Sequence, residues 1–138
     1  MKLFLSTALL FLASTNLFAD GLKPFTQQNF SDEFKSGKIV LLGFHSADDR
    51  SSARQKSVLH RILREKQFRG ISGLSLDFEK EHEMKAAFLV STPSTMILIR
   101  DGDSKEIARV TGITSPEAIR KILEEASRPS LFAEKARQ

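Results

Sequence analysis

The chain has 138 residues, a formal net charge of +4 at pH 7 and no cysteine. This length predicts a single domain, and so small a positive excess is not by itself typical of a nucleic-acid-binding protein. Because cysteine is absent, disulfides, thiolate metal sites and thiol nucleophiles are excluded, and the fold must be stable through packing alone.

The N-terminus has the layout of a secretory signal peptide. Lys2 supplies the positive charge, a mostly apolar stretch covers 3–13, and a run of polar to small residues leads to Ala19. The apolar stretch is shorter than the about 20 residues of a membrane span, which favours export over the alternative of a retained N-terminal anchor. We therefore expect a signal peptide at 1–19, a domain at 20–128, a tail at 129–138 and export, to the bacterial periplasm.

Hydrophobic periodicity and turn signals predict the elements of the domain. The expected order is α-β-α-β-α-β-β-α. Helices are expected at 27–36, 50–68 and 80–88. A fourth helix should begin at Pro116, with Ser115 as its N-cap, and end before Pro129. Strands are expected at 38–45, 72–78, 95–100 and 105–111.

The connections between these elements set the sheet. A helix joins the first two strands, so they should be parallel with a right-handed crossover. Asp101-Gly102 is a tight turn signal between the last two strands, so these should be antiparallel. Helices before, between and after the strands can cover both faces. The expected fold class is an α/β three-layer sandwich around a four-stranded mixed sheet.

Several stretches in this order resemble the thioredoxin-like family. FTQQNFSDEFKSGKIVLLGF is similar to the family's opening helix and central strand, and FHSADDRSSARQKSVL to the stretch that carries its active site. STPSTMILIRDGD and IARVTGITSPEAIRKILEEA are similar to its cis-proline loop, hairpin and final helix. The resemblance covers residues 24–127 and implies the thioredoxin fold.

The departures from that family concern its redox chemistry. Where the family has the two cysteines of Cys-x-x-Cys, this chain has Asp49 and Ser52. A carboxylate cannot form the mixed disulfide of thiol–disulfide exchange, and a hydroxyl cannot resolve it. The family's buried acid and its lysine partner match Gly43 and Ser75. The resemblance therefore implies a member without dithiol oxidoreductase activity and without a cofactor.

Two segments are candidates for a partner-binding surface. Asp49 is expected at a helix start, where unpaired N–H groups favour an anion and where either Asp48 or Asp49 caps the helix. Pro93 matches the family's cis-proline, and the resemblance implies that the backbone at Thr92 pairs with an extended peptide. With Ser52 these residues form the expected site for a protein or peptide. The alternative, that Pro93 only provides a turn, stays open.

A second candidate surface is basic. Arg50, Arg54, Arg61 and Arg64 fall within a narrow arc of the expected helix at 50–68, opposite its apolar residues. This pattern fits either a solvated face or a docking face for an acidic protein or an anionic lipid surface.

Other chemistry at the same place has weaker support. His45 with Asp48 and Asp49 lacks the spacing of known metal sites, and His45 with Ser51 or Ser52 lacks a nucleophile elbow. The sequence thus predicts an exported, redox-inactive interaction module, with no nucleic acid and no stable membrane span after signal cleavage. The alternative is a non-thiol enzyme, or an accessory subunit of an envelope assembly, that uses the same groove.

Overall fold

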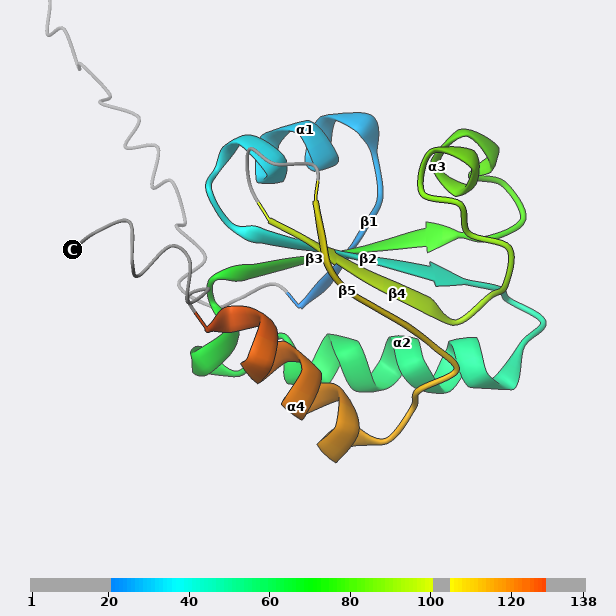
Figure 1. Cartoon of the computed structure of the whole chain (residues 1–138). Helices are drawn as coiled ribbons and strands as arrows, with labels where there is room; N and C mark the ends of the chain where they lie inside the picture. The colour runs from blue at the N-terminus through cyan, green and yellow to red at the C-terminus, as the bar shows by residue number, and fades with distance from the viewer. Residues whose placement is uncertain (1–20, 101–104, 129–138) are drawn as a thin grey trace, which may run out of the picture.

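The computed structural model describes residues 21–100 and 105–128. The expected signal peptide, the turn at Asp101-Gly102 and the tail at 129–138 lie outside the described residues. Within them, a central sheet lies between two layers of helices (Figure 1).

The helices and strands follow the predicted order, with additions at two places. The helices are α1 (Gln27–Lys35), α2 (Arg50–Ile62), α3 (His82–Ala87) and α4 (Pro116–Ser127), with the short 3-10 helix η1 (Lys66–Phe68) after α2. The strands are β1 (Leu22–Pro24), β2 (Ile39–His45), β3 (Ile71–Asp77), β4 (Thr95–Ile99) and β5 (Glu106–Thr111). In the described part of the chain, no helix has both the length and the apolar character that crossing a membrane requires.

The sheet is mixed and has the strand order β1-β3-β2-β4-β5. As predicted, β2 and β3 are parallel and β4 and β5 are antiparallel. The prediction of four strands was one too few, because β1 adds a parallel edge strand beside β3. With only three residues, β1 is too short to show the alternation that indicates a strand. Its last residue, Pro24, lacks an N–H, which an edge strand tolerates.

The long helix predicted at 50–68 ends earlier than expected. After Ile62 the backbone hydrogen bonds tighten, with Glu65 N–H donating to the Ile62 carbonyl at 2.9 Å. The chain then turns and continues as η1, which places Phe68 in the core with only 1% of its surface exposed. A tightened last turn of this kind is common where a helix ends.

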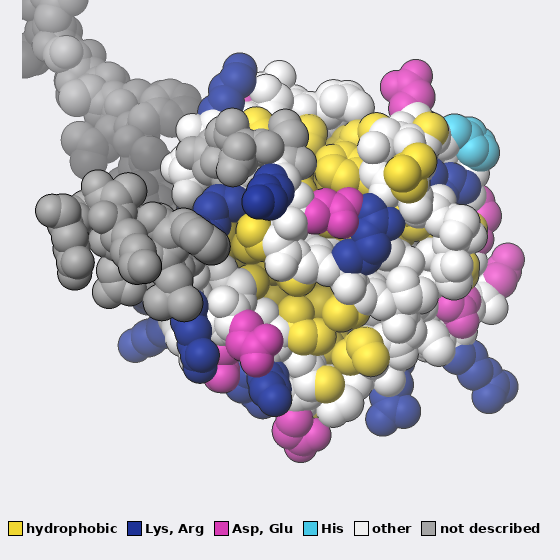
Figure 2. Space-filling view, in the orientation of Figure 1, with side chains coloured by type: hydrophobic (Ala, Val, Ile, Leu, Met, Phe, Trp, Pro, Cys, Tyr) yellow, Lys and Arg dark blue, Asp and Glu magenta, His cyan; other side chains and the backbone are white. Residues whose placement is uncertain are grey.

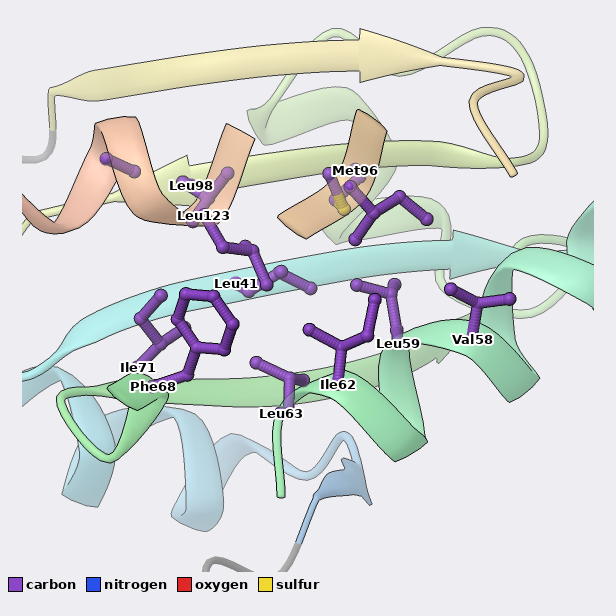
Figure 3. Packing of buried hydrophobic residues seen from close by; sticks show 12 residues of the cluster. Leu41, Val58, Leu59, Ile62, Leu63, Phe68, Ile71, Met96, Leu98 and Leu123 are labelled. Atoms are coloured by element: carbon purple, nitrogen blue, oxygen red, sulfur yellow. The ribbon is translucent and has the colours of Figure 1, made fainter. Parts of the chain in front are cut away.

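Both faces of the sheet carry a hydrophobic core. Helices α2 and α4 cover one face, where Leu41 of β2 packs with Leu59, Ile62 and Leu123 (Figure 3). Helices α1 and α3 cover the other face (Figure 1), with Phe30, Phe34 and Met84 packing against residues such as Val40, Leu42 and Phe44. Because β2 is buried on both faces, it reads as a continuous apolar run. The expected α/β sandwich is confirmed.

Candidate functional site

Asp49 begins α2 directly after the loop that follows β2. Its backbone is extended, with φ −108° and ψ 121°, and its carboxylate accepts from the Ser51 N–H at 3.2 Å. This is the geometry of a helix cap, which satisfies one of the N–H groups that a helix start leaves unpaired. The predicted cap at Asp49 is confirmed.

A chain of hydrogen bonds joins Asp49 to the loop before β4. The Ser46 N–H donates to Ser52 Oγ at 3.0 Å, Ser52 Oγ lies 2.9 Å from Ser94 Oγ, and Ser94 Oγ donates to Asp49 Oδ2 at 2.8 Å. Ser52 Oγ also lies 3.2 Å from Asp49 Oδ2, so the one hydroxyl proton of Ser52 has two acceptors, the carboxylate and Ser94 Oγ. Hydrogen bonds arranged in such a chain polarise and strengthen one another.

The residue that faces Asp49 and Ser52 is therefore Ser94, not Pro93. No peptide bond in the described part of the chain is cis, so Pro93 is trans and differs from the family's cis-proline. The loop turns instead at Ser94, which has a left-handed φ of 59°. Backbone hydrogen bonds hold this turn, with Ser94 N–H donating to the Phe44 carbonyl at 2.8 Å.

The four residues predicted as a partner surface differ in their exposure. Thr92 is exposed, and Asp49 and Pro93 are half-buried. Ser52 is 0% exposed, so it can support Asp49 from below but has no surface with which to touch a partner. The carbonyl of Thr92 accepts from the Thr95 hydroxyl at 2.7 Å, while no described residue accepts from the Thr92 N–H.

Asp49 is a stable anion at this surface. The hydroxyl of Ser94 holds the pKa of the Asp49 carboxyl below its usual value, partial desolvation opposes this, and the Ser51 N–H adds to the lowering. Its charge forms no ion pair with any residue in 21–100 or 105–128. We call Asp49, Thr92, Pro93 and Ser94 the platform.

A second buried network lies behind the platform, around His45. Gln55 Nε2 donates to the carbonyls of Ser94 and Ile113, each at 3.0 Å. The Gln55 Oε1 atom must then accept from His45 Nε2, 2.9 Å away, which places the imidazole proton on Nε2. His45 Nδ1 is left to accept from the Ser75 hydroxyl at 3.1 Å. Both ring nitrogens are thus satisfied within the protein.

Comparisons with known proteins give the fold its context. No protein-family model matches the sequence, and none of the curated proteins matches it. Among solved structures, Trxlp from Edwardsiella tarda EIB202 has a TM-score of 0.68 and 26% identity, covering 74% of this chain and 97% of that one. A mutant thioredoxin from Halobacterium salinarum NRC-1 has a TM-score of 0.69 and 16% identity, with coverages of 80% and 95%. The chain has the thioredoxin fold and contains no cysteine.

In this thioredoxin-like protein, His45 fills the space beside Gly43. A Cβ atom added to Gly43 would lie 2.6 Å from His45 Cε1, far inside normal contact distance. The resemblance matches Gly43 and Ser75 to the family's buried acid and lysine. A neutral imidazole, hydrogen-bonded to Ser75, has thus replaced that charged pair.

Burial keeps this imidazole neutral. Desolvation lowers the pKa of His45 from 6.5 to about 4, the hydrogen bond with Gln55 opposes the shift, and the charge of Lys56 adds to it. The sequence pointed to His45 but gave no signal for Gln55, because a glutamine in a helix is ordinarily a surface residue. Gln55 is 0% exposed.

A cavity of about 410 Å³ lies beside the thioredoxin-like protein's imidazole network. Residues of β1, α2, β3 and the end of β2 line it, among them His45, Ser75, Lys56 and Asp77. No three His, Asp or Glu side chains are grouped to hold a metal ion within residues 21–100 and 105–128. The ring nitrogens of His45 face Gln55 and Ser75 rather than Asp48 or Asp49.

The predicted basic residues lie along α2, beginning at Arg50, which directly follows Asp49 of the platform. Arg50, Arg54, Arg61 and Arg64 are all exposed along α2 and the turn that follows it. The apolar residues of the same helix, such as Leu59 and Ile62, are 0% exposed on its opposite side. The four arginines are therefore exposed, while a docking role for them stays a prediction.

Proposed function

We propose that this thioredoxin-like protein is an exported, redox-inactive module that binds a protein or peptide partner at the platform. The observation that carries the proposal is the 2.8 Å hydrogen bond from Ser94 to Asp49, which ties the start of α2 to the loop before β4. Two segments that are 45 residues apart in sequence are thereby fixed as one surface. A surface ordered in advance loses less conformational freedom on binding.

The platform offers two kinds of contact to a partner. The exposed Thr92 presents a backbone N–H without a described acceptor, which suits an extended peptide that adds strand-like hydrogen bonds. The Asp49 carboxylate is ionised and lacks a cation among the described residues. A partner segment with a lysine or arginine near its point of contact would complement that charge.

Export of the protein is part of the same proposal. The N-terminal sequence supports it, because Lys2, the apolar stretch at 3–13 and Ala19 follow the order of a signal peptide. A chain without cysteine also folds without needing oxidation in the compartment that it reaches. The bacterial periplasm is the compartment that we propose.

Affinity capture from envelope extract tests the binding role. We expect wild-type protein to retain a defined partner, and Thr92→Arg to reduce its recovery at least about tenfold, which corresponds to about 1.4 kcal/mol. Gln27→Arg is the matched control, because it adds the same side chain at an exposed position of α1. Equal recovery by all three proteins would contradict the use of the platform.

A non-thiol enzyme is the second candidate, favoured by one observation. The Ser75 hydroxyl, His45 and the Gln55 amide oxygen form a hydrogen-bonded series of nucleophile, base and orienting group beside the 410 Å³ cavity. The order resembles that of a hydrolase triad. The lowered pKa of His45, about 4, makes its imidazole a weak base at neutral pH, which is why this candidate ranks second.

A reactive fluorophosphonate distinguishes the two candidates. A serine activated by His45 would be labelled at Ser75, and the label would be lost in Ser75→Ala. The binding role predicts no labelling of either protein under conditions that label a serine hydrolase completely.

A further inference from the structure

The positive charge of the chain is concentrated on one segment. Residues 50–69 contain seven lysines and arginines and one acidic residue, Glu65, which gives this segment a formal charge of +6. The whole chain has a charge of +4, so all other residues together have a charge of −2. The small net charge of the chain is therefore the sum of one strongly basic segment and a weakly acidic remainder. In Figure 2, lysine and arginine side chains lie along the lower edge together with acidic ones, on the side where Figure 1 shows α2 and α4.

The arginines of this segment are not neutralised by their neighbours. Arg50, Arg54, Arg61 and Arg64 are exposed, and none of them forms an ion pair with another residue in the described ranges. Within residues 50–69 the one acidic side chain, Glu65, accepts from Arg120 of α4 at 2.8 Å, and Asp48 and Asp49 precede Arg50 without forming an ion pair with it. We call these four arginines the arginine face.

The arginine face lacks the features of a protein interface. Exposed residues between the arginines include Ser51, Ala53 and Ser57, and the large exposed hydrophobic residue of the described chain, Leu89, lies after α3. Protein interfaces usually have an apolar or aromatic centre. Guanidinium groups instead match the geometry of phosphate oxygens, which they bind through paired hydrogen bonds.

The N-terminal segment joins the domain beside the arginine face. Gly21, at the start of the described residues, packs so closely on His60 that an added Cβ would lie 2.7 Å from His60 Nδ1. The Leu22 N–H donates to the same nitrogen at 3.1 Å. His60 immediately precedes Arg61 in α2. The chain therefore enters the described domain beside α2.

We propose that the arginine face docks on the phosphate headgroups of an anionic lipid surface. Unpaired guanidiniums, and the lack of a large apolar side chain among the exposed residues between them, favour lipid over a protein partner. Attraction of this kind is electrostatic and is weakened by salt, because it falls off within a Debye length. Binding to lipid uses other residues than the platform does. The lipid proposal is therefore independent of the proposed protein or peptide partner.

Vesicle sedimentation of residues 20–138, the chain expected after signal cleavage, tests this proposal. The probes are vesicles of phosphatidylcholine alone and vesicles with roughly one part phosphatidylglycerol to three parts phosphatidylcholine. The triple variant Arg54→Gln/Arg61→Gln/Arg64→Gln should bind the anionic vesicles about 100-fold more weakly than wild type, at about fivefold for each basic residue. Neither protein should bind the neutral vesicles, because their surface has no net charge.

The control variant Lys35→Gln/Lys80→Gln/Lys105→Gln removes the same charge from other exposed positions. It should retain most of the binding to anionic vesicles, and its melting curve and that of the arginine variant should match wild type. An equal loss in both variants, or no preference of wild type for anionic vesicles, would overturn the proposal. So would tighter binding to a DNA duplex than to vesicles at equal phosphate concentration, since the face would then suit nucleic acid.

Discussion

Ser94 connects the two positions at which the thioredoxin family has its cysteines. Its hydroxyl bridges Asp49 and Ser52, the two residues that stand at the cysteine positions of the resemblance. Its left-handed backbone turns the loop into β4. The hydroxyl and the backbone conformation together place an ionised carboxylate at the surface, where the family has a thiol.

Removing the hydroxyl of Ser94 should raise the pKa of Asp49. The lost hydrogen bond is the largest cause of the present lowering, so Ser94→Ala should shift the carboxyl titration toward its ordinary value. Ser94→Gly should raise the pKa equally but cost less stability, because glycine adopts a φ of 59° without strain. Carboxyl carbon NMR titration and urea unfolding measure the two effects; an unchanged Asp49 titration in both variants would contradict the assigned bond.

Replacing Asp49 tests the cap itself. Asp49→Ala should lower the free energy of unfolding by about 1 kcal/mol, because α2 loses its capping side chain. Asp49→Asn keeps a capping oxygen, so its free energy of unfolding should fall by less. An Asp49→Ala protein with the melting midpoint of wild type would count against the cap.

The sequence predicted Asp49 but not Ser94, for a physical reason. A helix cap depends on residues two or three positions away, so the expected start of α2 was enough to indicate it. The contact between Ser52 and Ser94 joins residues 42 positions apart, and no local pattern reports such a pair. The match of Pro93 to the family proline pointed to the right loop, one residue from the side chain that makes the contact.

At the scale of elements, periodicity located the helices and strands that bury a regular face. Val58, Leu59 and Ile62 recur at helical spacing, and the structure buries all three on α2. The same signal failed for β1, whose three residues depend on pairing with β3. It also failed at the end of α2, because Leu63 and Phe68 are buried after the helix has ended.

Gln55 is the residue that joins α2 to its neighbouring elements. Its side chain contacts His45 of β2 and the carbonyls of Ser94 and Ile113, in the loops before β4 and before α4. Gln55→Ala should therefore lower the free energy of unfolding by about 2–4 kcal/mol, since buried polar groups lose their partners.

Gln55→Leu separates hydrogen bonding from side-chain volume. The leucine fills most of the space but leaves the same polar groups unpaired. The free energy of unfolding should therefore fall by a similar amount in Gln55→Leu and in Gln55→Ala. Denaturant unfolding of both variants is the measurement. Full stability in Gln55→Leu would show that Gln55 acts only as a space-filling residue.

At the scale of the whole molecule, stability should depend on the charge state of His45. The folded pKa is about 4, whereas an unfolded histidine titrates near 6.5. Above pH 6.5 both states are neutral and stability is at its plateau. As the pH falls from 6.5 to 4, the unfolded chain binds the proton first, so stability falls by about 3 kcal/mol.

The free energy of unfolding, measured across this pH range, isolates the contribution of His45 to stability. The pKa values of Asp49, Glu65 and Glu106 are lowered, by Ser94, Arg120 and Arg109 respectively, so these carboxylates add their own loss at lower pH. In His45→Gln the slope between pH 6.5 and about 5 should disappear, whatever the stability of that variant at pH 7. A slope that persists there would assign it to another group.

We propose a separate binding role for each of two surfaces of the molecule. The platform, at the start of α2 and the loop before β4, is proposed to bind a protein or peptide. The arginine face, along α2, is proposed to hold the domain near anionic lipid. The sequence alone indicated the four arginines and, in the platform, Asp49, Thr92 and Pro93. Ser94 and the buried network that fixes the platform appeared only in three dimensions.

The most direct test of the platform is photo-crosslinking in living cells of the source organism. A benzophenone side chain is introduced at position 92, or at position 27 on α1 as the control, and the cells are irradiated. Binding at the platform predicts a discrete protein adduct from position 92 and none from position 27. No adduct from position 92, or the same adduct from both positions, would contradict the account.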